Sequence, residues 1–372
     1  MILKKGSFYG MARDITKSES KIVIFGCGVV GSTITPEILK DYEIDDRVVC
    51  YVDNDKLRWD TSIEIFDREI KIFPPSKIKE LDGNITVLIS ASRYAGIYDQ
   101  LKTICREDRY SCYVIPMLCI ENFQVDGGKG VIKTSTKQLI PKKIHYAWFG
   151  GKPIPDGLQL CIDSWKRYCP DYEIIRWDES NYDVHKNQFV HQAYANRKYA
   201  FVPDFARFEI LYEYGGIYLD TDVLLKRNLD ELLYQEAFCG VEKWQVINPG
   251  GCCGAVKGHE SLKAYIQAWS NRSMYRLDGT VDNSSSGRID TAVAIKNGYK
   301  INGLTQNVLG MNIYSYDYFQ PYDYMSGKTE ITSDTFSVHQ YNGSWLDEKA
   351  KSDNEKATEM YEKMIALAIN VG

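Results

Sequence analysis

The sequence has no excess of positive charge and no long apolar run. Its 45 Lys and Arg are outnumbered by 50 Asp and Glu, so the formal net charge is -5. A surface that follows nucleic-acid phosphates needs an excess of Lys and Arg, and we therefore expect no nucleic-acid partner. No stretch reaches the roughly 18 apolar residues that span a bilayer, and residues 1–20 are too polar for a secretion signal. We expect neither a transmembrane segment nor secretion.

The 10 cysteines include no C-x-x-C pair. This absence argues against a zinc ribbon and against a thioredoxin-type redox site. Cysteines without a paired spacing are typical of reduced thiols in a cytoplasm. We therefore expect a cytoplasmic protein, and we leave open a peripheral association with the inner face of the membrane.

The first part of the chain reads as a strand, a glycine-rich turn, a helix and a second strand. Gly26, Gly28 and Gly31 have G-x-G-x-x-G spacing, and Asp53 follows the next apolar run. In dinucleotide-binding folds such glycines let the backbone approach a pyrophosphate, and the acid binds the ribose. Further alternation of strand-like and helix-like runs predicts a Rossmann-like parallel sheet domain over residues 1–125. Whether this domain binds a nucleotide or serves as a docking scaffold stays open.

A change of composition separates this domain from the rest of the chain. Residues 126–138 lose the periodicity and are rich in Gly, Lys, Ser and Thr, which predicts a linker. A second α/β pattern follows, and we expect it to form a separate domain over residues 139–372. A chain of 372 residues is long enough for two hydrophobic cores.

Two carboxylates, Asp220 and Asp222, are separated by one residue within a β-rich run. In an extended chain the side chains of residues i and i+2 point the same way, so both can bind one cation. Such a cation can neutralise the leaving diphosphate of a nucleotide sugar. The spacing alone is a weak signal, because Asp53 and Asp55 share it.

A helix with a proline in its first turn is expected over residues 203–213. Asp204 and Arg207 lie one helical turn apart on it and face the same way. One side chain can accept hydrogen bonds from sugar hydroxyls, and the other can donate to a diphosphate. The alternative is an ion pair on the surface.

Three segments resemble one family of enzymes, in the right order and spacing. They are residues 144–151 (IHYAWFGG), 199–207 (YAFVPDFAR) and 214–222 (YGGIYLDTD). They are similar to glycosyltransferases with a DXD sugar-binding motif, a family that includes bacterial capsule and lipopolysaccharide transferases and fungal mannosyltransferases, and to which large glucosylating toxins are related. The resemblance covers about residues 138–350. It implies a GT-A type mixed α/β domain, a Mn²⁺ or Mg²⁺ ion, and retention of anomeric configuration.

The resemblance also implies roles for individual residues. The expected catalytic residues are Asp204, Arg207, Asp220 and Asp222. The expected substrate contacts are Trp148, which would stack on the base, Tyr218, Asp290 and Trp345. The expected metal ligands are Asp220, Asp222, Ser344 and His339, with Asn342 as an alternative to His339. A core position for Trp148 and a structural role for His339 are the competing interpretations.

We therefore expect a metal-dependent, retaining glycosyltransferase that moves a hexose from a nucleotide sugar to a glycan or lipid-linked acceptor in surface polysaccharide biosynthesis. Two alternatives stay open. A nucleotide-sugar oxidoreductase or epimerase would use the first domain, and it would need a Tyr-x-x-x-Lys pair or an equivalent acid and base. A non-catalytic glycan-binding protein would need only the 27 Tyr and 7 Trp, but it leaves the Asp220 and Asp222 spacing unexplained.

Overall fold

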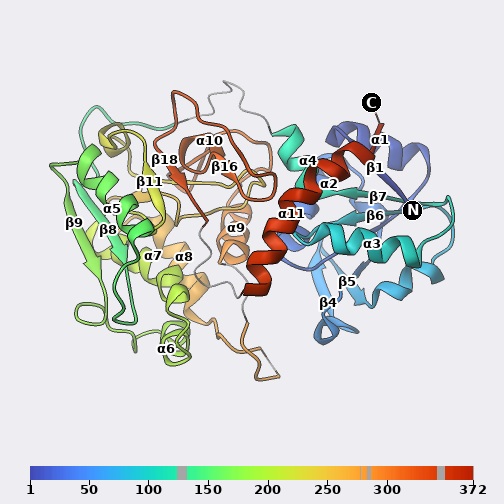
Figure 1. Cartoon of the computed structure of the whole chain (residues 1–372), viewed down its shortest axis with the longest axis horizontal. Coiled ribbons are helices and arrows are strands. Elements are labelled where there is room, and N and C mark those ends of the chain that lie inside the picture. Colours follow the sequence, from blue (N-terminus) through green and yellow to red (C-terminus); the bar gives the residue numbers. More distant parts are fainter. Residues whose placement is uncertain (124–131, 277, 283–285, 342–347, 372) are drawn as a thin grey trace.

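The computed structural model describes residues 1–123, 132–276, 278–282, 286–341 and 348–371, and Figure 1 shows them arranged as two α/β units side by side. Each unit is built around its own sheet. The first sheet has the order β19-β1-β7-β6-β2-β3-β5-β4, and the second has the order β14-β15-β12-β13-β10-β8-β9.

The first sheet is parallel at every pairing except that between β4 and β5. Its strands are β1 (Ile2–Gly6), β2 (Lys21–Phe25), β3 (Val48–Val52), β4 (Ser62–Ile65), β5 (Arg68–Phe73), β6 (Ile85–Ile89), β7 (Tyr110–Val114) and β19 (Ile369–Val371). Its helices are α1 (Phe8–Lys17), α2 (Thr35–Asp41), α3 (Tyr94–Ile104) and α4 (Ile115–Asn122), with shorter turns η1 (Val30–Ile34), η2 (Asp45–Arg47), η3 (Lys56–Arg58) and η4 (Pro75–Glu80). The central strand β6 is apolar and buried along its whole length, as expected for a parallel sheet covered on both faces.

The last described residues correct the predicted domain boundary, which assigned everything up to residue 372 to the second domain. The helix α11 (Glu348–Leu367) packs against α3 of the first unit, and Figure 1 shows it running from the middle of the molecule toward β1. Strand β19 then pairs in parallel with β1, and Lys5 Nζ donates a hydrogen bond to the carbonyl oxygen of Ile365 at 2.8 Å. The physical reason is that Tyr361 and Met364 bury their side chains in the core that contains the first sheet.

The second sheet mixes parallel and antiparallel pairings. Its strands are β8 (Lys143–Ala147), β9 (Glu173–Trp177), β10 (Gly216–Tyr218), β12 (Ala237–Gly240), β13 (Cys253–Ala255), β14 (Gln306–Val308) and β15 (Met311–Tyr314). Two small pairs accompany it: β11 (Val223–Leu225) with β18 (Ser337–His339), and β16 (Tyr322–Asp323) with β17 (Lys328–Thr329). The helices are α5 (Asp156–Tyr168), α6 (Gln188–Ala195), α7 (Val202–Tyr214), α8 (Glu260–Ser270), α9 (Gly287–Lys296) and α10 (Tyr316–Phe319), with η5 (Tyr199–Phe201) and η6 (Asp230–Leu233).

Helix α7 matches the helix predicted over residues 203–213. Pro203 lies in its first turn, and Gly215 and Gly216, with φ values of 63° and 112°, end it and lead directly into β10. These positive φ angles suit glycine, and a Cβ atom on Gly216 would also come within 2.9 Å of His145 Nε2. The two glycines thus bring the helix that carries Asp204 next to the strand that leads to the DXD motif.

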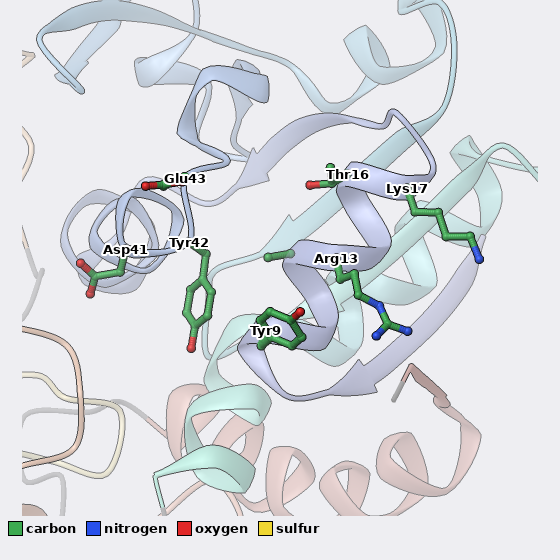
Figure 2. Close-up of a pocket in the computed structure, with 8 residues that line it drawn as sticks. Tyr9, Arg13, Thr16, Lys17, Asp41, Tyr42 and Glu43 are labelled. Carbon is green, nitrogen blue, oxygen red and sulfur yellow. The ribbon is translucent and has the colours of Figure 1, made fainter.

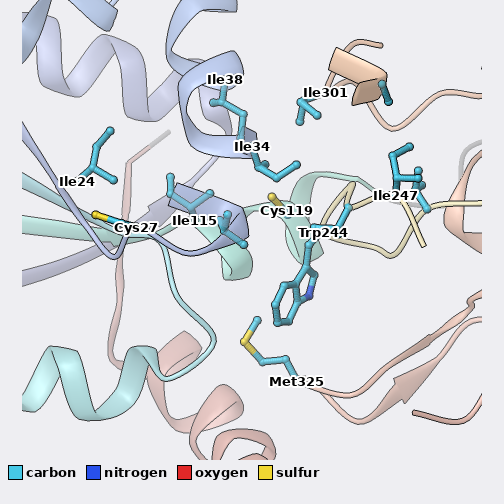
Figure 3. Close-up of a cluster of buried hydrophobic side chains, with 14 of the residues drawn as sticks. Ile24, Cys27, Ile34, Ile38, Ile115, Cys119, Trp244, Ile247, Ile301 and Met325 are labelled. Atoms are coloured by element: carbon cyan, nitrogen blue, oxygen red, sulfur yellow. The ribbon is translucent and has the colours of Figure 1, made fainter. Parts of the chain in front are cut away.

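The two units share one hydrophobic cluster. Cys27, Ile115 and Cys119 of the first unit belong to this buried cluster together with Trp244 and Met325 of the second, and Figure 3 shows Cys119 next to Trp244. An ion pair between Arg276 Nη1 and Asp55 Oδ2, at 3.0 Å, also joins the two units. The first unit is therefore packed against the second rather than tethered loosely by a linker.

All 10 cysteines are buried and free in this structure. Within the described residues, no helix combines the length and the apolar character required to cross a membrane. Of the predicted linker, residues 132–138 are described and residues 126–131 lie outside the described residues.

Candidate active site

A cleft of about 860 Å³ lies where the two units meet. Six residues predicted to be functional line it from the second unit: Trp148, Asp204, Arg207, Asp220, Asp222 and His339. The first unit contributes residues 28–30 of the glycine turn and residues 90–93, which follow β6. The structure thus brings together residues that are far apart in the sequence.

Asp220 and Asp222 lie in a turn between β10 and β11, and not within one strand. The backbone N–H of Val223 donates to the carbonyl oxygen of Asp220 at 3.1 Å, which closes this turn. The prediction that strand alternation aligns the two carboxylates was therefore wrong in its geometry. Both side chains nevertheless line the same cleft.

His339 is hydrogen-bonded to Asp222. The antiparallel pairing of β11 with β18 sets His339 opposite Val223, and His339 Nε2 lies 3.1 Å from Asp222 Oδ1. Burial alone would lower the pKa of His339, but the adjacent carboxylate of Asp222 outweighs it and the pKa is raised. This contact fixes the orientation of Asp222 in the cleft.

Arg207 contacts two further acids of the cleft, Asp204 and Asp220. Its Nη2 atom lies 2.9 Å from Asp204 Oδ1 and 3.7 Å from Asp220 Oδ1, and its Nε donates to the carbonyl oxygen of Pro203 at 2.9 Å. Only 4% of the Arg207 side chain is exposed, so the surface ion pair considered from the sequence is excluded. Burial raises the pKa of Asp204 to about 6, against the opposing effect of Arg207.

Trp148 follows β8 and is partly exposed to the cleft, which excludes the alternative of a core tryptophan. Its Nε1 donates to the carbonyl oxygen of Lys152 at 2.7 Å, and this bond fixes the ring. Gly150 permits the close approach of Tyr199, because a Cβ atom on Gly150 would lie 2.5 Å from that ring. An indole at the mouth of the cleft is suited to stacking on a planar base.

Comparison with known proteins agrees with this geometry. Residues 155–239, which contain Asp204, Arg207, Asp220 and Asp222, match a family described as "Glycosyltransferase sugar-binding region containing DXD motif". The resemblance to this family is confirmed. We call residues 155–239 the DXD segment.

Several relatives of the chain are fungal enzymes. A mannosyl phosphorylinositol ceramide synthase of Saccharomyces cerevisiae is 32% identical over 211 residues, which is 50% of each chain. An inositol phosphoceramide mannosyltransferase of Schizosaccharomyces pombe is 35% identical over 152 residues, covering 37% of this chain and 39% of the relative. The chain thus matches about half or less of the length of these relatives.

One solved structure, the PaToxG glycosyltransferase, is 18% identical to this chain. The match covers 55% of this chain and 78% of the PaToxG chain. Its TM-score of 0.35 supports no statement about the fold.

Two predicted substrate contacts of this chain are enclosed in the core. Tyr218, within the DXD segment, and Asp290, on α9, are both 0% exposed, and neither lines the cleft. Trp269 Nε1 donates to Asp290 Oδ1 at 2.9 Å, while Asp290 Oδ2 is buried without a hydrogen-bond partner among the described residues. Burial raises the pKa of Asp290 to about 8. The prediction of direct substrate contact is therefore wrong for both residues in this structure, because other side chains cover them.

The metal site stays a prediction. Ser344, Trp345 and the alternative ligand Asn342 lie outside the described residues. Within the residues that are described, no group of three or more His, Cys, Asp or Glu has a geometry that could hold a metal. Asp220 and Asp222 present carboxylate oxygens to one cleft, and such oxygens are the ligands that Mg²⁺ and Mn²⁺ favour.

In the first unit, the carboxylate of Asp53 forms a hydrogen bond to the backbone of the glycine turn. Asp53 Oδ2 accepts a hydrogen bond from the backbone N–H of Cys27 at 2.8 Å, and Asp53 Oδ1 accepts one from Asp55 N at 2.8 Å. A Cβ atom on Gly31 would lie 1.9 Å from the Gly26 carbonyl oxygen, so the turn needs glycine there. Asp53 thus supports the turn in this structure, and nucleotide binding by Gly26, Gly28, Gly31 and Asp53 stays a prediction.

One spacing in the first unit was overlooked in the sequence. Tyr98 and Lys102 on α3 have the Tyr-x-x-x-Lys separation that an oxidoreductase or epimerase would need. Lys102 Nζ lies 2.6 Å from Asp99 Oδ1 and 5.0 Å from the Tyr98 ring centroid, and neither Tyr98 nor Lys102 lines the cleft. Their arrangement gives no support to that alternative.

Sequence reasoning also missed several residues that line the cleft: Arg93, Lys152, Arg197, Lys198, Glu242, Trp244, Tyr324 and Tyr341. Asn248 lines it as well. Burial raises the pKa of Glu242 to about 7. No motif marks Glu242, because its position in the cleft depends on a hairpin that follows β12.

A second hollow, of about 470 Å³, lies on the first unit between α1 and α2 and shares no lining residue with the cleft. Figure 2 shows Tyr9, Tyr42 and Arg13 around it, and Asp41 and Glu43 complete a wall of mixed charge. These exposed side chains carry charges of both signs and indicate no particular ligand. The cleft between the two units is therefore the candidate active site.

Proposed function

We propose that this protein is a metal-dependent, retaining glycosyltransferase that moves a hexose from a nucleotide sugar to a glycan or lipid-linked acceptor. The observation that carries the proposal is that Asp220, Asp222 and Arg207 of the DXD segment line one cleft together with Trp148. The proposal includes a GT-A type second domain and a Rossmann-like first domain, and the order and direction of the strands are consistent with both.

The donor would be held by residues at both ends of its diphosphate. Trp148 is suited to stack on the base, and Arg207 can donate to the phosphates from a buried position. Asp204, hydrogen-bonded to Arg207, can accept hydrogen bonds from hydroxyls of the donor sugar. A guanidinium held in a fixed position stabilises the charge that develops on the departing diphosphate.

Asp220 and Asp222 would hold a Mn²⁺ or Mg²⁺ ion, which supplies positive charge to the leaving diphosphate when bound. His339 would then orient Asp222 through the contact at 3.1 Å, in the way that hydrogen-bonded partners orient metal-binding carboxylates. Arg207 would keep Asp220 in place from the opposite side at 3.7 Å.

The acceptor and the cellular setting belong to the same proposal. The name of one fungal relative, an inositol phosphoceramide mannosyltransferase, describes transfer of mannose to inositol phosphoceramide. Mannose is therefore the first donor sugar to test, and a glycan or an inositol-containing lipid is the first acceptor. A lipid-linked acceptor would bring the protein to the inner face of a membrane, consistent with a role in surface polysaccharide or glycolipid synthesis.

The test is hydrolysis and transfer with a panel of radiolabelled nucleotide sugars, with Mn²⁺ or with EDTA. We expect turnover of one donor that EDTA abolishes, and a loss of about 100-fold or more in Asp220→Asn and in Asp222→Asn. Asp163→Asn, an exposed acid on α5 within the DXD segment, is the matched control and should keep full activity. Full activity of either DXD variant with saturating Mn²⁺ would reject the proposal.

A further inference from the structure

Part of the cleft is lined by an acid and aromatic rings that the proposed donor site does not use. Tyr324 and Tyr341 are partly exposed there, with ring centroids 5.2 Å apart. Trp244 packs behind Tyr324 at 5.1 Å and donates from Nε1 to Asp323 Oδ1 at 2.9 Å. Figure 3 shows Trp244 next to Cys119 of the first unit, so these rings lie where the two units meet.

Glu242 connects these rings to the DXD motif. Asn248 Nδ2 donates to Glu242 Oε1 at 3.0 Å and lies 3.4 Å from His339 Nδ1. His339 in turn contacts Asp222 at 3.1 Å. Contacts through Asn248 and His339 thus join Glu242 to Asp222, and Glu242 lines the same cleft as the two tyrosines.

A partly exposed tyrosine face beside a carboxylate matches the chemistry of a polyhydroxylated ring. The apolar C–H face of such a ring packs on an aromatic surface, and its hydroxyls need hydrogen-bond acceptors. A carboxylate offers about four acceptor positions, and Asn248 uses one of those on Glu242.

We propose that Glu242, Tyr324 and Tyr341 form the acceptor subsite, in which a sugar or inositol ring lies against the tyrosines and one of its hydroxyls donates to Glu242. This inference rests on the proposed function, since it names the acceptor side of the same cleft. Glu242 is an acceptor-contact residue here, and no proton transfer is assigned to it.

The first unit also lines the cleft through its glycine turn. Gly28 is exposed, lines the cleft, and has no heavy atom within 4 Å of the position that a Cβ would take. A larger side chain at Gly28 would therefore extend into open space rather than into the protein. In this proposal the glycine turn forms part of the wall of the acceptor subsite.

The first test separates transfer from hydrolysis of the donor. In Glu242→Gln we expect the acceptor KM to rise about tenfold or more, while metal-dependent hydrolysis of the nucleotide sugar stays within about twofold of the wild type. Glu260→Gln, an exposed acid on α8, is the matched control. An unchanged acceptor KM, or a loss of hydrolysis equal to the loss of transfer, would overturn the assignment.

A second test asks whether the glycine turn at Gly28 forms part of the acceptor subsite. Gly28→Leu should raise the acceptor KM and spare donor hydrolysis, whereas Gly96→Leu, at an exposed glycine of α3 that also has open space and does not line the cleft, should change neither. Equal effects of the two variants on the acceptor KM would show that the first unit is not part of the subsite.

A binding test distinguishes failure of the acceptor subsite from failure of the proposed transferase function. Methyl α-mannoside and myo-inositol serve as probes, with saturation-transfer NMR as the readout, in the wild type and in Glu242→Gln. Glu242-dependent binding of the mannoside indicates a glycan acceptor, and that of inositol indicates an inositol lipid. If no nucleotide sugar is hydrolysed but a probe still binds through Glu242, the transferase proposal fails and the subsite stands. If hydrolysis occurs and neither probe depends on Glu242, the subsite fails.

Discussion

Gly250 lies so close to Asp220 that a Cβ atom on Gly250 would come within 2.0 Å of Asp220 Oδ2. The same Cβ would lie 3.0 Å from Arg207 Nη1. The backbone also joins the two positions, because Asp220 N donates to the Gly250 carbonyl oxygen at 2.9 Å. The absence of a side chain at Gly250 therefore gives the Asp220 carboxylate its place in the cleft.

Gly250→Ala should displace the Asp220 carboxylate and lower the rate of donor hydrolysis by about 100-fold, since a misplaced charged group loses its electrostatic contribution. Metal-dependent hydrolysis measures the effect. Gly157→Ala, at an exposed position of α5 with open space, is the control and should be silent. Wild-type activity in Gly250→Ala would show that the Asp220 position is not critical.

His339→Ala should raise the Mn²⁺ concentration needed for half-maximal activity by about 10- to 100-fold, because Asp222 loses the partner that orients it. Titration of activity with Mn²⁺ measures this shift. His185→Ala removes an exposed histidine and should leave the titration unchanged. A lower maximal rate with an unshifted Mn²⁺ requirement would contradict an orienting role.

Arg207→Lys keeps the charge but loses the planar fork that reaches Asp204 and the Pro203 carbonyl oxygen together. We expect kcat to fall by about 100-fold, with a smaller change in donor KM. Steady-state kinetics of hydrolysis measure both parameters, and Arg227→Lys at a more exposed ion pair is the control. Retention of kcat would mean that a point charge at this position is sufficient.

Asp290 should make the protein less stable as the pH rises. Burial raises the pKa of Asp290 from an ordinary value of 3.8 to about 8, so the folded state binds a proton more tightly than the unfolded state. The associated stability is complete below pH 4 and is lost as the pH rises toward 8. Asp290→Asn keeps an acceptor for Trp269 Nε1 without this titration.

Thermal unfolding of the wild type and of Asp290→Asn between pH 4 and pH 8.5 measures this difference. The Tm of the variant should exceed that of the wild type at pH 8.5, and the gap should narrow toward pH 4. A gap that is constant over this range would show that Asp290 does not titrate with folding.

The elements predicted with success are those whose signals are local. The helix that carries Asp204 and Arg207 has a proline at its start and two glycines at its end, and the structure places it at Val202–Tyr214. The glycine turn after β2 likewise follows from the spacing of Gly26, Gly28 and Gly31. Each of these patterns depends on neighbouring residues alone.

The features that could not be predicted from the sequence depend on contacts between distant segments of the chain. Tyr218 has the same alternation as Asp220, but the turn after β10 leaves its ring in the core and the carboxylate in the cleft. Glu242 accepts a hydrogen bond from Asn248 in the hairpin that follows β12, and Asn248 in turn contacts His339, which is 91 residues further along the chain. Strand β19 is three residues long, too short for a periodic signal.

The pairing of β19 with β1 also limits how the molecule can be divided experimentally. A fragment that stops at residue 125 lacks β19, which covers the edge of β1 over Lys4–Gly6. Unpaired N–H and C=O groups along a strand edge are a template for pairing with another chain. Such a fragment is therefore prone to self-association, and a soluble version of the first unit would have residues 348–371 joined to it as a fusion.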